Sequence, residues 1–239
     1  MNGERLSEVP AGAEPGEGFP PADGGPERLL RLSRGFSCLF WAMPVLSFAH
    51  AAGLTPVLDV RWTLGILLGG FLPLLWGLWR LRMGGGTTPG WIRRIRRVTL
   101  LAVATMYLSP FLAWWSAAPA QAYFAVNAAA HYLAMIVLLA GLNRLAGEAG
   151  SGMVDAGLQR EAKAGLGMVL WLSGCTVAAL AWIYHRAGVL EAGWPTVAAH
   201  LSQLPREART LFLLPYAMTA YVMWRAKESA LHRMVRRLA

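Results

Sequence analysis

Six stretches of the chain are almost continuously apolar, and polar residues gather between them. The stretches cover about 36–57, 62–80, 98–117, 122–143, 164–184 and 209–225. A helix that crosses a bilayer needs roughly 20 apolar residues, and none of the six stretches contains Asp or Glu. Because backbone polar groups in lipid must be satisfied within their own segment, the stretches are expected to be helical. The pattern predicts an all-α, polytopic membrane protein with six transmembrane helices.

Basic residues are distributed unequally between the two sides of this predicted bundle. Of the 22 Lys and Arg residues, 18 fall in the N-terminal segment, the second and fourth connections and the C-terminal end. The other four, on the opposite side, are Arg61, Arg186, Arg206 and Arg209. Cytoplasmic segments carry the excess of Lys and Arg. We therefore expect both termini in the cytoplasm and a multi-pass protein of the cell (inner) membrane.

Composition agrees with this interpretation and divides the chain into three regions. Hydrophobic residues make up 56% of the 239 residues and charged residues only 15%, whereas soluble domains carry about a quarter charged residues. Residues 1–26, rich in Gly, Pro, Glu and Ala, are predicted to be a disordered cytoplasmic segment. A six-helix membrane domain follows over 27–225, and 226–239 form a basic amphipathic cytoplasmic tail. The net charge of +9 follows from this topology, so no nucleic-acid partner is predicted.

Three short segments have the pattern of amphipathic helices that lie at a membrane surface. Residues 27–35 and 91–97 are basic, and residues 195–204 begin with a proline on the outer side. Anchoring to anionic lipid headgroups is the favoured interpretation of the two basic segments. Docking of another protein subunit is the alternative for all three.

Two histidines are prominent because the predicted spans hold few polar side chains. His50 lies in the first span and His131 in the fourth, at similar depth when counted at about 1.5 Å per residue. The pair is a candidate for the axial ligands of a b-type haem, for a metal site or for a quinone site. Asn127, one turn before His131, is a candidate to orient the second ring nitrogen of that histidine. The alternative is that each histidine only hydrogen-bonds a neighbouring helix.

Residues at the predicted outer surface complete this candidate site. Arg61 and Arg186 are expected where they can meet the propionates of a haem. His185, at the outer end of the fifth span, is a third candidate ligand. His200 and His232 are expected at the surface.

Two fragments of the chain resemble the b-type cytochrome membrane subunits of bacterial dehydrogenases and hydrogenases. The first is the basic lead-in Arg31-Leu-Ser-Arg34-Gly-Phe-Ser37 before the first span, with Trp41 further along. The second is the fourth span with His131. The sequence departs from that family at the ligand positions, because Ser37 stands where a histidine is expected and Leu145 where a second histidine would follow. The likeness is therefore too partial to assign the family.

Small and hydroxyl-bearing residues mark further contacts between helices. Gly65 and Gly69 form a Gly-x-x-x-Gly motif, which predicts close packing of the second span on a neighbour. A neighbour within the chain is favoured over one in another chain. Hydroxyls also accompany prolines, at Thr105 and Ser109 beside Pro110 and at Thr219 after Pro215. A hydroxyl can satisfy the carbonyl that a proline leaves unpaired, so a structural role is favoured over a substrate path.

No motif of an autonomous enzyme is visible. The chain has no Gly-rich phosphate loop, zinc-type Cys/His spacing or Gly-x-Ser-x-Gly elbow. The preferred prediction is an integral membrane subunit of a larger complex with other protein subunits, in particular a redox or electron-transfer assembly. The alternatives are a small permease or channel-like transporter and a purely structural scaffold subunit. A membrane enzyme acting on lipid is the least favoured, because the spans carry no carboxylate.

Overall fold

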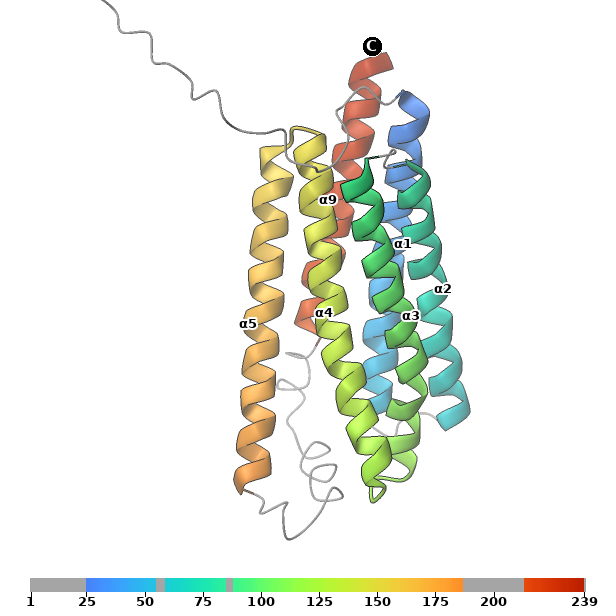
Figure 1. Cartoon of the computed structure of the whole chain (residues 1–239), viewed down its shortest axis with the longest axis vertical. Helices are drawn as coiled ribbons and strands as arrows, with labels where there is room; N and C mark the ends of the chain where they lie inside the picture. Colours follow the sequence, from blue (N-terminus) through green and yellow to red (C-terminus); the bar gives the residue numbers. More distant parts are fainter. Residues whose placement is uncertain (1–24, 55–58, 85–87, 187–212, 239) are drawn as a thin grey trace, which may run out of the picture.

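The computed structural model describes residues 25–54, 59–84, 88–186 and 213–238. All regular secondary structure in these ranges is α-helical (Figure 1). The six helices are α1 (Pro26–Leu54), α2 (Val60–Gly84), α3 (Pro89–Ala117), α4 (Ala122–Gly152), α5 (Ala156–Arg186) and α9 (Leu214–Leu238). The prediction of an all-α protein is confirmed for this part of the chain.

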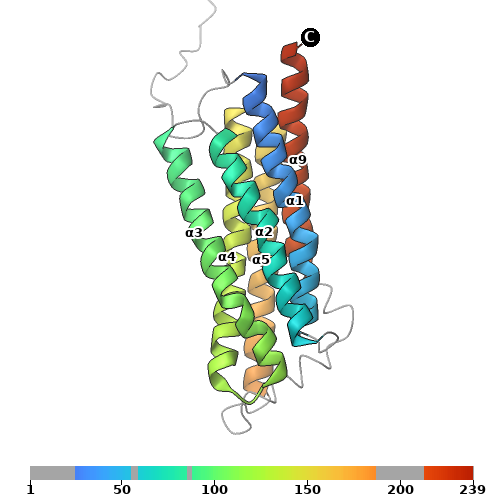
Figure 2. The ribbon, with the colours of Figure 1, turned by 90° about the vertical axis from the view of Figure 1, so that its right-hand side faces the viewer.

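The helices lie side by side as one elongated bundle, with successive helices running in opposite directions (Figures 1 and 2). α1 packs against α2 and α9, and α2 also contacts α3. α4 lies between α3 and α5, and α9 closes the bundle by contacting α5 and α4 as well as α1. The start of α1 and the end of α9 lie at the same end of the bundle (Figure 1).

Four of the helices are long and apolar enough to cross a membrane. They span Pro26–Ala52, Val60–Gly84, Pro89–Ala117 and Ala122–Gly152, with 25 to 31 residues each. At about 1.5 Å per residue such helices exceed the hydrocarbon thickness of roughly 30 Å. The protein is therefore a membrane protein with transmembrane helices. α9 differs because its second half, from Arg225 onward, carries most of its charged residues.

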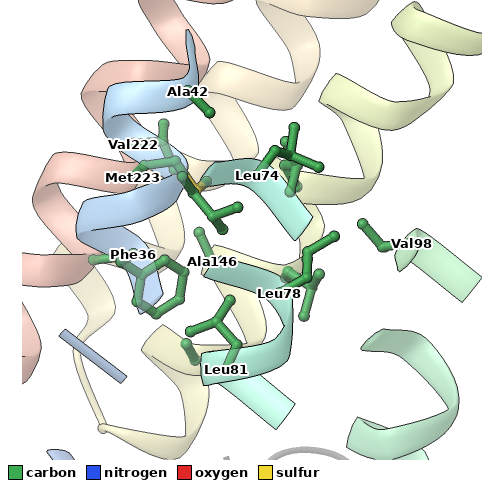
Figure 3. Packing of buried hydrophobic residues seen from close by; sticks show 14 of the residues in the cluster. Phe36, Ala42, Leu74, Leu78, Leu81, Val98, Ala146, Val222 and Met223 are labelled. Carbon is green, nitrogen blue, oxygen red and sulfur yellow. The ribbon is translucent and has the colours of Figure 1, made fainter. Parts of the chain in front are cut away.

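The core of the bundle joins all six helices through buried apolar side chains, and Figure 3 shows part of it. Phe36 of α1, Leu74 and Leu78 of α2 and Met223 of α9 are each 0% exposed. Lipid chains are as apolar as these side chains, so tight packing rather than exclusion of water holds such helices together.

Glycines bring α1 and α2 close together, although not the two that the sequence motif indicated. A Cβ at Gly77 would lie 2.9 Å from the carbonyl oxygen of Gly35, and one at Gly70 would lie 2.9 Å from Leu46 Cδ2. A Cβ at Gly65 or Gly69 would have no atom within 4 Å. The expected packing of the Gly-x-x-x-Gly motif within the chain is therefore wrong, because the motif lies on the outward face of α2.

The two basic segments, 27–35 and 91–97, are the first turns of α1 and α3, not separate interfacial helices. Their apolar side chains face the bundle, since Leu32, Trp91 and Ile95 are each at most 1% exposed. The Trp91 indole N–H also donates to the carbonyl of Leu81 on α2, at 3.4 Å. The interfacial interpretation of these two segments is thus corrected. The third segment, 195–204, and residues 1–24 lie outside the described ranges.

The segment predicted as a cytoplasmic tail continues α9 without a break as far as Leu238. Ala226 and Ala230 are fully buried against the bundle. Ion pairs hold the same end together: Arg225 Nε lies 2.8 Å from Glu161 Oε2 on α5, and Arg94 of α3 pairs with Glu148 of α4.

A tight turn joins α4 to α5 and is also tied to α9. The amide of Asp155 donates to the carbonyl of Gly150 at 2.8 Å, and Val154 between them has a φ of 51°. This is the Schellman ending of a helix, in which the left-handed position is usually glycine. The Asp155 carboxylate then accepts from the backbone N–H of Leu158, at 3.0 Å, and from the Ser229 hydroxyl of α9, at 2.6 Å.

Candidate functional site: a buried histidine pair

The two histidines singled out from the sequence meet in the interior of the bundle. His50 of α1 and His131 of α4 are 5% and 1% exposed. Their Nε2 atoms are 2.7 Å apart. The ring planes differ by only 9°, with ring centres 4.9 Å apart. Two side chains 81 residues apart in sequence therefore form one hydrogen-bonded pair.

The outer nitrogen of each ring is held by a backbone carbonyl. His50 Nδ1 lies 2.6 Å from the carbonyl oxygen of Leu46, one turn earlier on α1. His131 Nδ1 lies 2.9 Å from the carbonyl oxygen of Thr105, on α3. These contacts fix the orientation of both imidazoles, as outer hydrogen bonds do for functional histidines generally.

A tyrosine from a fourth helix completes the surroundings of the pair. The ring of Tyr216, near the start of the described part of α9, has its centre 5.4 Å from that of His50 and is inclined to it by 38°. Tyr216 itself is 5% exposed. Side chains or carbonyls of α1, α3, α4 and α9 thus converge on one point.

The other residues predicted for this site do not join it. Asn127 is half-buried, and its amide donates to the carbonyl of Tyr123 at 2.8 Å, so the Thr105 carbonyl has the role expected of Asn127. Arg61, in the first turn of α2, and His185, near the end of α5, are exposed. Arg186 is the last residue of α5, and its side chain lies outside the described part.

Sequence reasoning identified Thr105 and Tyr216 as polar positions but did not connect them with the histidines. Both lie near a proline, in the notches at Pro110 and Pro215. The contact made by Thr105 is through its carbonyl, and a backbone atom leaves no signal in residue type. Counting residues from the ends of the predicted spans placed His50 and His131 at one depth. The same count could have added Tyr216 to the site only if the helices next to α9 had been known.

The hydroxyls beside the prolines donate to carbonyls of their own helices. Ser109 donates to the carbonyl of Met106 at 2.7 Å, which is the carbonyl that Pro110 leaves without an N–H partner. Thr219 donates to the carbonyl of Pro215 at 2.8 Å and accepts from the amide of Asn143 at 2.9 Å. The structural interpretation is confirmed for the notch at Pro110, whereas Thr219 bonds the carbonyl of Pro215 itself and links α9 to α4 through Asn143.

The pair in this arrangement does not fit a haem. Metal–imidazole bonds are about 2.0–2.1 Å, so two axial nitrogens on one iron stand about 4 Å apart, whereas the two Nε2 atoms are 2.7 Å apart. A metal site of three or more ligands does not fit either, because no three His, Cys, Asp or Glu side chains converge within residues 25–54, 59–84, 88–186 and 213–238. What the geometry suits is a hydrogen bond between the two rings.

Comparison with known proteins adds no relative: no family model, no curated protein and no solved structure matches the chain.

Proposed function

We propose that the protein is a six-span protein of the inner membrane with both termini in the cytoplasm. Four helices meet the requirements of a span, and α5 and α9 extend the same alternating bundle. The excess of basic residues at the end where α1 begins and α9 ends supports this orientation. The test fuses two reporter enzymes separately to the C-terminus, one active only in the cytoplasm and one active only in the periplasm. We expect activity of the cytoplasmic reporter, and activity of the periplasmic reporter alone would contradict the orientation.

We further propose that the protein is the membrane subunit of a redox complex and that the His50–His131 pair is its functional centre. The observation that carries this proposal is the mutual hydrogen bond of two buried imidazoles, 2.7 Å between Nε2 atoms. Ionisable side chains inside membrane bundles are costly and typically mark ion or substrate pathways or proton relays. Histidine is the side chain that exchanges a proton most readily near neutral pH.

Of the two redox centres considered, a quinone is supported better than a haem. Reduction of a quinone takes up protons as well as electrons, so a proton-carrying group inside the bundle is useful there. An open apolar hollow of about 320 Å³ lies at the α3–α4 turn, lined by Trp114, Ala117, Ala118 and Phe124. The aromatic rings of Trp114 and Phe124 at this shallow, open site can stack on a flat ring. Phe124 is seven residues before His131 on α4, which corresponds to about 10 Å along the helix.

The test compares three forms of the protein purified with its partners from native membranes: the wild type, His131→Ala and His232→Ala. The last is the control, since the His232 side chain is 76% exposed on α9. Bound quinone is extracted and quantified, and a reduced-minus-oxidised visible spectrum is recorded. We expect near-stoichiometric quinone in the wild type and the control and a loss of most of it in His131→Ala.

Two other outcomes would overturn this version of the function. A haem band that disappears in His131→Ala would replace the quinone with a haem and require α1 and α4 to separate at the pair. Absence of both quinone and haem from a complex with intact partners would overturn the redox role and leave a scaffold subunit.

A further inference from the structure

The contacts around the histidine pair need more protons than two neutral imidazoles possess. There are three such contacts: His50 Nδ1 to the Leu46 oxygen, Nε2 to Nε2, and His131 Nδ1 to the Thr105 oxygen. Carbonyl oxygens only accept, so each Nδ1 must carry a hydrogen. A neutral imidazole has one N–H, and its other nitrogen is then an acceptor. With both hydrogens on Nδ1, two bare Nε2 lone pairs would face each other at 2.7 Å.

The other arrangement of two hydrogens, with one on an Nδ1 and one on an Nε2, also leaves one of the three contacts without a donor. If one ring moves its hydrogen to Nε2, the N–N contact becomes a hydrogen bond, but the Nδ1 of that ring then presents a lone pair to a carbonyl oxygen at 2.6 or 2.9 Å. Two acceptors at that distance repel, and a buried acceptor is then left without a donor, which is unfavourable. Only three protons supply a donor to all three contacts.

We propose that the His50–His131 pair is a binding site for one proton, held between the two Nε2 atoms. With this third proton bound, the pair is an imidazole–imidazolium unit with a net charge of +1. The short N–N distance of 2.7 Å agrees with a charge-assisted hydrogen bond, which is shorter and stronger than a neutral one. The proton comes from the aqueous phase, and its binding makes or breaks no other bond.

The surroundings stabilise a positive charge without an acidic side chain. The carbonyl dipoles of Leu46 and Thr105 point at the two ends of the pair, and the Tyr216 ring lies within the range of a cation–π contact, at 5.4 Å. The nearly coplanar rings share the charge between them. Tyr216 of α9 is the one titratable side chain with a ring contact to the pair among the described residues, and α1, α3 and α4 contribute carbonyls and the imidazoles themselves.

Release of the proton must change the structure locally. With two protons, either the Nε2 atoms separate or one Nδ1 leaves its carbonyl. If the Nδ1 that leaves is that of His131, the contact between α3 and α4 loosens, because the Thr105 oxygen belongs to α3 and His131 to α4. The His50 Nδ1, by contrast, contacts a carbonyl of its own helix. Binding of the proton is thereby coupled to the packing of these helices, which gives the pair two distinct arrangements.

The experiment is solid-state NMR of the full chain in lipid bilayers at neutral pH, with ¹⁵N-labelled histidine. We expect two Nδ1–H signals and one proton shared by two Nε2 nuclei, seen as a ¹⁵N–¹⁵N coupling across the hydrogen bond. The coupling should disappear in His50→Gln and persist in His232→Gln, which removes the exposed histidine on α9. Because the wild-type spectrum alone counts the protons, the result does not depend on the folding of a variant.

Three results would overturn the proposal: only two N–H protons on the pair, no coupling between the Nε2 nuclei, or signals of metal-bound imidazole. The inference does not rest on the redox role, since a scaffold subunit could hold the same proton. A shared proton in a protein that carries neither quinone nor haem would uphold this inference and overturn the function proposed above, and quinone binding with only two protons would do the reverse.

Discussion

Gly165 of α5 is a position where we expect one added methyl group to disturb the packing of three helices. A Cβ there would lie 2.7 Å from Asn143 Oδ1 on α4 and 2.8 Å from Val222 Cγ2 on α9. Asn143 cannot easily give way, because its amide donates to the carbonyl of Leu139 and to the Thr219 hydroxyl, both at 2.9 Å. The substitution Gly165→Ala therefore wedges apart the junction of three helices.

The magnitude follows from two opposing effects. Overpacking of a well-packed interior costs about 1–3 kcal/mol, and displacement of Asn143 weakens its two hydrogen bonds further. Alanine favours the helix over glycine by about 0.5–1 kcal/mol, which offsets part of this cost. We expect Gly165→Ala to lower the free energy of unfolding by about 1–3 kcal/mol.

Gly167→Ala is the matched control, because a Cβ at Gly167 would meet no atom within 4 Å. It keeps the gain in helix preference without the clash and should be neutral or slightly stabilising. The assay is reversible unfolding of both variants in mixed micelles, followed by circular dichroism. Equal stability of Gly165→Ala and Gly167→Ala would refute the close packing of α4, α5 and α9 at Asn143.

Three further predictions concern the turn after α4 and the α1–α2 contact. Val154→Gly should raise the free energy of unfolding by about 1 kcal/mol in the same assay, since a left-handed φ of 51° is unfavourable for a β-branched residue; a loss of stability would show that the turn is not strained. Partial burial raises the pKa of Asp155, but hydrogen bonds from Ser229 and Leu158 outweigh it, and the pKa lies below the ordinary 3.8. The carboxylate therefore stabilises the fold fully above pH 3.8 and progressively less as the pH falls towards its lowered pKa. Asp155→Ala should lower the free energy of unfolding by about 1 kcal/mol at neutral pH. It should also reduce the loss of that free energy between neutral and acid pH, and the same loss as in the wild type would contradict this role of Asp155. Gly77→Ala should destabilise by about 1–3 kcal/mol because its Cβ would meet the Gly35 carbonyl at 2.9 Å, whereas Gly69→Ala should be tolerated; similar effects of the two would refute this α1–α2 packing.

The apolar runs of the sequence were sufficient to predict helices and a membrane protein. This succeeds because lipid leaves the backbone of such a run no alternative partner, so composition and length alone determine the secondary structure. The same runs did not show where the helices begin. The basic residues of 27–35 and 91–97 suggested surface segments, yet Leu32, Trp91 and Ile95 continue the buried faces of α1 and α3. Whether an amphipathic turn faces lipid headgroups or a neighbouring helix depends on packing.

Counting residues along antiparallel helices was also sufficient to place His50 and His131 at one depth, because the rise per residue of a helix is fixed. It did not show that α1 and α4 lie close enough for the imidazoles to meet, nor that the ring nitrogens are 2.7 Å apart. That distance, and the carbonyls of Leu46 and Thr105 at the outer nitrogens, depend on the arrangement of the helices around the bundle. Backbone carbonyls are the same in every residue, so only the tertiary structure could show which of them face the pair.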